Sequence, residues 1–364
     1  MTQRKQAVLV TGVSGSLGSR LLPQLQAYDV VGVDVVPPSV SISRYAQVDL
    51  GRESSCRLLV ELLRETKAVA VVHLAFIDNP ARAGVSDTQR QWQTNVAGTA
   101  RVMEAITEIN RSGGKISKFI FTSSAQVYGP RLESPASESS LLAACSLTSA
   151  VHKKSADEVV QYRASSLGPC SSFILRAQNY AGPDADSFTL AALRGIPSGR
   201  AERACEWRKR NKRMRFFIPF GQHYLERELQ FVHVDDMARL IAHILQRSGA
   251  TTTTILNVSG RDGSLSFERC VKLCGTKLRR LPTVAACRAA LRWYMNRGLS
   301  TIPPQAVPYL LGSNPVDTKR LREFLGSSYK EVIRHTAESA LSDTLLTRGL
   351  GDDALHAVSL SVGS

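Results

Sequence analysis

The chain has 364 residues, of which 43% are hydrophobic and 21% are charged. This composition can bury a sizeable core and is not typical of a disordered chain. No apolar run approaches the ~20 residues that a membrane span needs, since the longest candidate, residues 68–77, is interrupted by His73. The N-terminal stretch lacks a small-residue cleavage site, so we expect no secretory signal. An integral membrane protein, a collagen-like chain and a disulfide-stapled miniprotein are not expected.

The seven cysteines predict neither a disulfide framework nor a metal site. They are scattered, and the only close pair, Cys270 and Cys274, has the i,i+4 spacing of a helix without neighbouring histidines. Reduced core thiols fit this pattern better than disulfides or zinc ligands. We therefore expect no metal and a reducing, cytoplasmic setting.

The formal net charge of +15 is partly local. Residues 203–215 (RACEWRKRNKRMR) hold seven basic residues and one acid, Glu206, with Trp207 as the interleaved aromatic residue. Such a stretch could bind phosphates or an anionic surface, and the alternative is a solvated loop or helix face. Nothing else in the sequence resembles a nucleic-acid-binding module, so we expect neither a nucleic acid nor a membrane as a partner.

Strand-like and helix-like segments alternate over the first 180 residues. Pro23 lies inside the first helix and should kink it or loosen its second turn. The alternation predicts an α/β fold with a parallel sheet, right-handed crossovers and both faces covered. The predicted strands are residues 7–10, 30–35, 69–74, 116–121 and 172–175, and the predicted helices are residues 17–25, 56–63, 92–109 and 151–167.

The pattern loosens after residue 180. Residues 184–228 are mixed and charged, and residues 263–350 look mainly helical with a break at 302–304. The tail from about residue 350 is expected to be poorly ordered. Between these segments we expect a strand at 229–234, a helix at 237–245 with Asp235 or Asp236 as its N-cap, and a last strand at 255–258.

The strongest chemical signal is a glycine-rich loop at residues 12–18 (GVSGSLG), between a predicted strand and a predicted helix. Its glycines let the backbone turn tightly and approach a pyrophosphate at the positive end of the helix. Asp34 ends the second apolar run, where a carboxylate can hold a ribose 2′-hydroxyl and repel a 2′-phosphate. The loop and Asp34 together predict a site for NAD rather than NADP.

The spacing G-x-x-G-x-x-G resembles that of the short-chain dehydrogenase/reductase superfamily, specifically its extended NAD-dependent epimerase/dehydratase branch. Further segments resemble this branch in the right order, and the resemblance spans residues 6–330. They are Asp49-Leu50, 73–75 (HLA), 94–99 (TNVAGT), 119–129 (FIFTSSAQVYG), 175–183 (LRAQNYAGP), 231–236 (FVHVDD) and 314–326 (NPVDTKRLREFLG).

The resemblance implies a Rossmann-type doubly wound parallel sheet with a smaller, mainly helical C-terminal substrate-binding region. Residues 1–180 and 229–260 would bind NAD, residues 181–228 and 261–350 would bind the substrate, and residues 351–364 would form a tail.

The resemblance also implies site residues. Those for catalysis are Ser124 and Lys153, and those for the substrate are Ser124, Gln126 and Asn179. A homodimer through the helices near 87–110 and 150–167 is typical of the family. The cofactor residues would be Gly12, Ser14, Gly15, Ser16, Leu17, Gly18, Asp34, Asp49, Leu50, Leu74, Ala75, Asn95 and Lys153.

One departure from the family concerns catalysis. The family uses a Ser or Thr, a Tyr and a Lys, with the Tyr four residues before the Lys. Aligning the helix after Ser124 makes Lys153 the lysine equivalent and places Ser149 in the tyrosine position. If Lys154 is chosen instead, that position holds Ala150. A missing acid–base residue typically costs ~10²–10⁴ in rate.

Other groups are poor substitutes for the missing phenol. Tyr128 belongs to the preceding turn, and Tyr162 lies about two helical turns downstream of Lys153. His152 has a side-chain pKa suited to neutral proton transfer. On a helix, however, it would point about 100° away from Lys153.

A second departure concerns the substrate. Nucleotide-sugar members of the family usually carry Arg-Asp before the late strand, with the Arg on the substrate diphosphate, and this chain has Leu229-Gln230 there. A UDP-sugar substrate is therefore not expected, and the basic stretch 203–215 could supply other anion contacts. His73 and His233, single histidines at predicted strand ends, are expected to be satisfied structural residues.

The sequence leaves competing functional hypotheses. The first is an NAD-dependent oxidoreductase or epimerase acting on a hydroxyl or carbonyl of a small metabolite, with the usual catalytic Tyr absent. The alternative is a catalytically weak or inactive NAD-binding protein with a regulatory or scaffold role. A nucleic-acid-associated protein that uses residues 203–215 has only charge in its favour.

Overall fold

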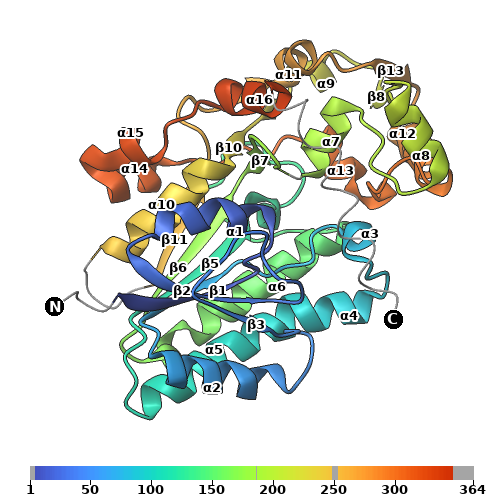
Figure 1. The fold of residues 1–364 in the computed structure, drawn as a ribbon. Helices are drawn as coiled ribbons and strands as arrows, with labels where there is room; N and C mark the ends of the chain where they lie inside the picture. The colour runs from blue at the N-terminus through green and yellow to red at the C-terminus, as the bar shows by residue number, and fades with distance from the viewer. Residues whose placement is uncertain (1–4, 186, 248–252, 347–364) are drawn as a thin grey trace.

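A seven-stranded, all-parallel sheet forms the centre of the molecule in the computed structural model, which describes residues 5–185, 187–247 and 253–346 (Figure 1). The strand order is β3-β2-β1-β4-β5-β6-β11, so the order reverses between β1 and β4. Ligands of such sheets bind outside the carboxyl ends of the strands at this reversal. The strands are β1 (Gln6–Thr11), β2 (Tyr28–Asp34), β3 (Arg44–Gln47), β4 (Ala70–His73), β5 (Lys118–Ser124), β6 (Ser171–Ala177) and β11 (Thr253–Val258).

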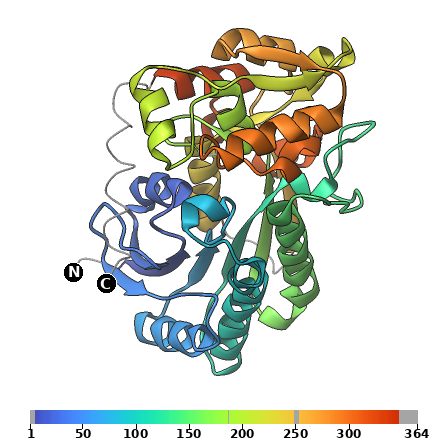
Figure 2. The ribbon, with the colours of Figure 1, turned by 90° about the vertical axis from the view of Figure 1, so that its right-hand side faces the viewer.

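Helices cover both faces of the sheet because its strands are apolar on both sides. Successive side chains of a strand point to opposite faces, and in β1 Val8 and Val10 join one buried cluster while Leu9 joins the other. The first face carries α1 (Ser16–Leu21), α10 (Val234–Gln246) and α14 (Lys319–Leu325); the second carries α2 (Ser55–Thr66), α5 (Gly98–Arg111) and α6 (Thr148–Arg163) (Figures 1 and 2). The predicted doubly wound fold is confirmed.

Two predicted helices are broken, and Pro23 explains the first break. The α-helical hydrogen bonding of α1 ends at Leu21, and the chain continues as a 3₁₀ turn, η1 (Leu22–Leu25), that contains Pro23. This confirms the predicted loosening of the second turn, since proline lacks the N–H that an α-helix needs. The helical segment 92–109 is divided into α4 (Thr88–Trp92), a π-helical turn η2 (Gln93–Ala97) and α5.

Three predictions about the later chain are wrong. The strand expected at 229–234 is two strands in different sheets, β9 (Glu228–Leu229) and β10 (Phe231–His233), which pair with β12 (Leu265–Ser266) and β7 (Asn179–Ala181). The N-cap of α10 is His233 rather than Asp235 or Asp236, because the main-chain N–H of Asp235 donates to His233 Nδ1 at 3.1 Å. β11 is also not the last strand, since β12 and β13 (Leu278–Leu281) follow it.

A second, mainly helical region lies over the carboxyl edge of the sheet and has its own apolar core (Figure 1). The predicted break at 302–304 is confirmed, because a 3₁₀ turn, η5 (Pro304–Ala306), follows Pro303. The region contains α7 (Phe188–Arg194), α8 (Glu202–Lys209), β8 (Phe216–Pro219), α9 (His223–Glu226), α11 (Phe267–Cys274), α12 (Val284–Asn296), α13 (Val307–Leu311) and α16 (Ala337–Leu346).

The remaining elements are short connections. They are α3 (Pro80–Ala83), η3 (Ala125–Tyr128), η4 (Ala164–Leu167), η6 (Gly326–Ser328) and α15 (Tyr329–Val332). The tail expected from about residue 350 lies outside the described residues. No helix in the described ranges is long and apolar enough to cross a membrane.

All seven cysteines are free, but the predicted core position holds only for Cys170, Cys270, Cys274 and Cys287, since Cys145 is exposed and Cys56 and Cys205 are partly buried. Cys270 and Cys274 are buried in the core of the second region. Burial raises the pKa of the Cys270 thiol to about 12, so it stays protonated and behaves as an apolar core group.

Candidate active site

The glycine-rich loop crosses the carboxyl end of β1, at the strand reversal. Gly12 has φ +72°, and a Cβ there would lie 2.5 Å from the main-chain nitrogen of Ala75. A Cβ at Gly18 would lie 2.4 Å from the carbonyl oxygen of Val13. Both glycines are therefore required by close backbone approaches, which leave the main-chain surface of the loop open to a ligand.

Asp34 closes one end of this loop. Its Oδ2 accepts a hydrogen bond from the main-chain N–H of Ser14 at 3.0 Å, and its Oδ1 accepts one from the N–H of Val35 at 2.7 Å. Burial raises the pKa of the Asp34 carboxyl, while these main-chain donors and the Ser14 hydroxyl oppose the rise. The carboxylate thus lies beside the loop, as the sequence predicted.

Other predicted cofactor residues also meet at the loop. Leu74 and Ala75 follow β4, and their N–H groups donate to the main-chain oxygen of Thr11 at 3.0 Å and to its Oγ1 at 3.3 Å. Leu17 packs against the sheet core. The Ser16 hydroxyl donates to the carbonyl oxygen of Asp184 at 2.8 Å, which ties the loop to the segment after β7.

Asn95 positions the backbone after β4. It is fully buried in η2, its Oδ1 accepts from the N–H of Ile77 at 2.7 Å, and its Nδ2 donates to the carbonyl oxygen of Ile77 at 3.0 Å. Both polar groups of its amide are therefore used by Ile77. Asn95 would therefore influence a cofactor indirectly, by fixing the path of residues 75–79.

Asp49 and Leu50 lie where the adenine end of a dinucleotide is expected, but both are already engaged. Asp49 Oδ2 forms an ion pair with Arg90 of α4, and Arg52 approaches the same oxygen at 3.5 Å. Leu50 is buried against Gly98 at the start of α5. The contact of Arg90 with Asp49 was missed, because no short-range pattern links residues 41 positions apart.

His73 is the satisfied structural residue that was expected. Its Nδ1 lies 2.6 Å from Thr11 Oγ1, and its Nε2 lies 3.0 Å from Thr99 Oγ1. Burial lowers the pKa of His73 to about 3, with a smaller contribution from Lys153. The ring is therefore neutral and links β1, β4 and α5.

The NAD expected from the sequence fits these residues. The backbone around Gly12 leaves no room for a side chain. The Asp34 carboxylate keeps further lone pairs that can accept from ribose hydroxyls. Residues 35–41 (VVPPSVS) after Asp34 carry no basic side chain, whereas a 2′-phosphate usually needs a nearby arginine. The donor set therefore favours NAD over NADP.

Lys153 lies in a buried pocket at the carboxyl end of β5. Its Nζ donates to the carbonyl oxygen of Thr122 at 3.0 Å and lies 3.4 Å from the centroid of the Phe76 ring. Burial lowers the pKa of Lys153 to about 7, with Asp78 and Asp157 opposing the shift. Phe76 and Asp78 are site residues that the sequence analysis missed.

Ser149 lies one helical turn before Lys153 on α6. It is buried, and its hydroxyl has no hydrogen-bond partner among the described residues. His152 is also buried, and its Nδ1 likewise has no partner in the described part of the chain. The position predicted for the tyrosine therefore presents an unengaged hydroxyl next to the lysine.

The two neighbouring tyrosines do not compensate for it. The Tyr128 hydroxyl is buried, donates to Asn257 Oδ1 at 2.7 Å and accepts from Arg176 at 2.8 Å. Tyr162 is 87% exposed at the far end of α6. Both therefore behave as the sequence analysis expected.

A buried polar network fixes β5 against α6. Asp157 forms a two-point ion pair with Arg176, with N–O distances of 2.9 and 2.8 Å, and accepts from the Ser123 hydroxyl at 2.5 Å. Asp157 and Arg176 are no more than 1% exposed. Because Ser123 precedes Ser124 and Asp157 lies one turn after Lys153, this network sets the separation of the two predicted catalytic residues.

The predicted substrate residues lie at the mouth of this site. Ser124 accepts a hydrogen bond from the main-chain N–H of Gln126 at 3.2 Å. The carbonyl oxygen of Gln126 in turn accepts from the Tyr309 hydroxyl of α13 at 3.3 Å. Asn179 Nδ2 donates to the carbonyl oxygen of Gln230 at 3.1 Å. These contacts join the sheet edge to the second region.

Leu229 and Gln230 are structural here. Leu229 is buried and pairs with Leu265, and the Gln230 side chain bonds the backbone of Val316 at 2.8 and 3.2 Å. Arg227, two positions earlier, is only 7% exposed and lies 3.5 Å from the centroid of the Phe267 ring. Burial lowers the pKa of Arg227 to about 9. The described residues supply it with two carbonyl oxygens and no ion pair.

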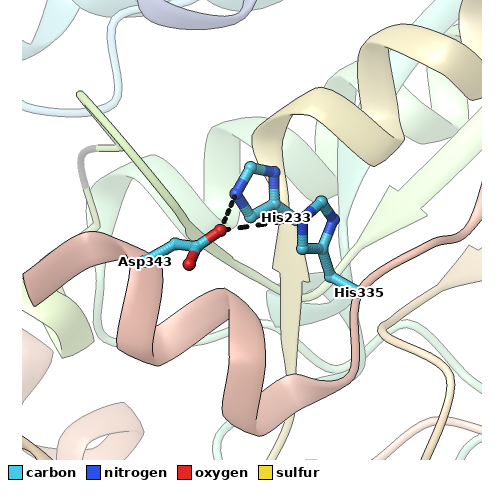
Figure 3. A group of neighbouring side chains, drawn as sticks. All are labelled: His233, His335 and Asp343. Carbon is cyan, nitrogen blue, oxygen red and sulfur yellow. Dashed lines mark ion pairs between the residues drawn. The ribbon is translucent and has the colours of Figure 1, made fainter. Parts of the chain in front are cut away.

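His233 differs from its expected role as a fully satisfied residue. Its Nε2 has no hydrogen-bond partner among the described residues and lies 3.5 Å from Asp343 Oδ2 (Figure 3). The His335 ring stacks on it with centroids 3.8 Å apart, and the His335 Nε2 lies 3.7 Å from the same oxygen. His335 Nδ1 also lies 2.9 Å from Asp236.

The spacing of His233, His335 and Asp343 is close enough for a metal ion. His233 Nδ1 is already engaged, because it accepts from the main-chain N–H of Asp235, and burial lowers the pKa of this histidine. The cluster joins α16 to the end of β10.

The chain has recognisable relatives. The sequence profile of the NAD dependent epimerase/dehydratase family matches residues 8–259. The UDP-glucose 4-epimerase 2 of Arabidopsis thaliana is 29% identical over 153 residues, which are 38% of this chain and 42% of the plant enzyme, so the match spans less than half of that relative's length. A UDP-glucose 4-epimerase of Klebsiella pneumoniae is 30% identical over 146 residues, covering 36% of this chain and 99% of that protein.

Solved structures share the fold. The Bordetella bronchiseptica enzyme WbmH in complex with NAD⁺ superposes with a TM-score of 0.66 at 17% identity, over 96% of this chain and all of that one. The family profile covers more than half of the chain, including the glycine-rich loop, Asp34 and Lys153. The chain therefore belongs to the NAD dependent epimerase/dehydratase family.

Proposed function

We propose that the protein is an NAD-dependent oxidoreductase or epimerase of the extended short-chain dehydrogenase type, acting on a hydroxyl or carbonyl of a small, sugar-like metabolite without the usual catalytic tyrosine. The observation that carries the proposal is the convergence of the glycine-rich loop, Asp34 and Lys153 on one sheet edge. Residues 6–180 and the later strand β11 would hold the cofactor, and the helical region above would hold the substrate.

Each residue has a proposed role in this site. The loop amides would face the pyrophosphate, Asp34 would accept from the adenosine ribose, and Lys153 would donate to the nicotinamide ribose. NAD, when bound, would supply the hydride acceptor and donor. Ser124 would hold the substrate oxygen by a hydrogen bond from its hydroxyl. Proton transfer would have to rely on groups other than a tyrosine at position 149.

A sugar-like substrate is supported by the relatives that are UDP-glucose 4-epimerases. The diphosphate contact typical of such enzymes would have to differ here, since Leu229 is buried and uncharged. Arg227 is a nearby cation, but its guanidinium is enclosed by Phe267 and two carbonyl oxygens.

The second candidate is a catalytically weak or inactive NAD-binding protein. The buried, unpartnered Ser149 hydroxyl favours it, because an isolated serine hydroxyl has too high a pKa to act as the acid or base unaided. A homodimer through α5 and α6 fits either candidate. Tyr162 and Val151, exposed on α6, would lie on its interface.

Turnover separates the two candidates. The protein is incubated with NAD and a panel of sugar nucleotides, sugar phosphates and simple sugar alcohols, and NADH absorbance and product NMR spectra are recorded. We expect conversion of at least one compound, and a loss of at least ~10²-fold in rate in Ser124→Ala. Saturable NAD binding without conversion of any compound, even at stoichiometric enzyme, would favour the second candidate.

A further inference from the structure

A strongly basic surface covers one end of the second region. We define this basic end as eleven exposed cations on α8 and the segment after it, on β13 and on α12. The corresponding segments, 202–215 and 277–297, contain two acids, Glu202 and Glu206. The cations are Arg203, Lys209, Arg210, Lys212, Arg215, Lys277, Arg279, Arg280, Arg288, Arg292 and Arg297.

Tertiary structure brings these segments together. β13 pairs with β8 in parallel, with Arg279 opposite Phe217. Phe217 contacts Tyr294 of α12 at a ring-centroid distance of 5.4 Å, and Ala204 of α8 shares a buried cluster with Tyr294. In Figure 1, α8, α12, β8 and β13 lie together at one end of the molecule. The basic stretch 203–215 is thus one part of a larger charged surface.

The charge of the basic end is not neutralised within the molecule. Among the described residues, none of its eleven cations forms an ion pair, whereas several basic residues of the sheet helices, such as Arg57 and Arg64 of α2, pair with a glutamate. Clustered like charges repel one another and destabilise the folded state unless an anion lies nearby. The surface therefore favours a polyanionic partner.

The side chains beside these cations favour a lipid bilayer over a nucleic acid. On the outer side of α12, Trp293 is 49% exposed and Met295 is 39% exposed, between Arg292 and Arg297. Tryptophan among cations is typical of helices that lie in a membrane interface. The Arg297 guanidinium lies 5.0 Å from the Trp293 ring centroid and covers one face of it. This leaves less of the ring for stacking on a base.

We propose that the basic end docks the protein on a membrane surface rich in anionic phospholipid, with Trp293 in the headgroup layer. The docking is peripheral and needs no membrane-spanning helix. This goes beyond the proposed function and does not depend on it.

The test is sedimentation of the full-length protein with vesicles of phosphatidylcholine containing about 30% phosphatidylglycerol, against vesicles of phosphatidylcholine alone. We expect binding to the anionic vesicles that weakens steeply as salt rises through about 0.3 M. In Arg279→Glu/Arg288→Glu/Arg292→Glu the vesicle partition coefficient falls by at least about tenfold. The matched control, Arg57→Glu/Arg64→Glu/Arg111→Glu on α2 and α5, changes the net charge equally and stays within about twofold.

Insertion of Trp293 is measured separately. The variant Trp92→Phe/Trp207→Phe keeps Trp293 as its single tryptophan, and its fluorescence is recorded with vesicles that carry brominated acyl chains. We expect quenching. No vesicle binding at low salt, equal losses in the two charge-reversal variants, or binding without quenching would each overturn the proposal. So would poly(U) binding that is tighter than vesicle binding at the same salt and is lost in the same triple variant.

Discussion

Lys153 is the residue whose environment differs most from that of an ordinary surface side chain. It is enclosed by Phe76, Phe121 and the carbonyl oxygen of Thr122, and burial lowers its pKa to about 7 from 10.5. A lysine near its neutral point changes its charge readily when a charged cofactor or substrate arrives nearby. The charge of Lys153 is therefore linked both to folding and to the candidate chemistry.

The lowered pKa of Lys153 makes stability depend on pH in a defined direction. Between pH 7 and 10.5 the unfolded chain binds more protons at this lysine than the folded chain does. The free energy of unfolding therefore rises with pH across this range, by up to about 1.4 kcal/mol per pH unit. The stability that depends on a neutral Lys153 is fully present above the unfolded pKa and is lost as pH falls towards about 7.

Urea unfolding at pH 7, 8 and 9, without cofactor, tests this for the wild type and Lys153→Met. We expect the stability of the wild type relative to the variant to rise with pH. Arg227, whose pKa burial also lowers, is present in both proteins, so its effect cancels. Stability curves that stay parallel across this range would contradict the assignment.

Ser149 gives the second residue-scale prediction. Its buried, unpartnered hydroxyl lies one turn before Lys153, where a phenol would complete the family's acid–base pair. In Ser149→Tyr we expect the rate of NAD reduction with an accepted substrate to rise by ~10²-fold, because the phenol would supply the missing proton transfer.

Ser149→Phe is the matched control, since it adds the same ring without the hydroxyl, and thermal melting checks that both variants fold. A gain in Ser149→Tyr alone supports the assignment of position 149. Equal rates in the two folded variants would show that a phenol at this position is not what limits turnover.

At the scale of elements, the separation of β5, α6 and β6 depends on one buried ion pair. Asp157 and Arg176 are fully enclosed, and Arg176 also donates to Tyr128 at 2.8 Å. Removing one partner of such a pair leaves an uncompensated buried charge. Breaking this pair should therefore also disturb the relative positions of Ser124 and Lys153.

Asp157→Asn should lower the free energy of unfolding by about 3–5 kcal/mol. The matched control is Glu158→Gln, which removes an exposed carboxylate 3.7 Å from Lys154 and should cost less than about 1 kcal/mol. Denaturant unfolding measures both variants. A loss in Asp157→Asn no larger than in the control would mean that the pair does not stabilise the site.

Elements were predictable where their own residues specify them. The apolar runs of β1 and β4 and the helical spacing of α5 identified these elements from sequence, and Pro23 marked the end of α1. The two-residue strands β9 and β12 were missed, because such short segments have no periodicity of their own and depend on tertiary pairing. The cap at His233 was missed because histidine is an uncommon N-cap.

At the scale of the whole molecule, the loop and Asp34 could be predicted from residues 12–34 alone, since glycine spacing and strand length fix their approach. Contacts between distant segments could not be predicted. The ion pair of Asp49 with Arg90 and the stack of His233 on His335 join residues that lie far apart in the sequence and meet only in the folded chain. The burial of Arg227 also required the second region to be assembled.

The sheet region and the second region present different charged groups. The sheet edge holds Asp34 and the main-chain amides of the glycine-rich loop, while the basic end carries exposed cations of the second region. The two proposals are independent, because one concerns a small anionic cofactor and the other an extended anionic surface. If one of the two proposals proves wrong, the other can still be tested.

Isothermal titration calorimetry with NAD and NADP tests the central claim most directly, on the wild type and on Asp34→Ala. We expect one saturable NAD site per chain, NADP affinity at least about tenfold weaker, and a clear loss of NAD affinity in the variant because a ribose hydroxyl loses its acceptor. If neither dinucleotide produces heat or raises the melting temperature of the wild type, the glycine-rich loop and Asp34 do not form a cofactor site.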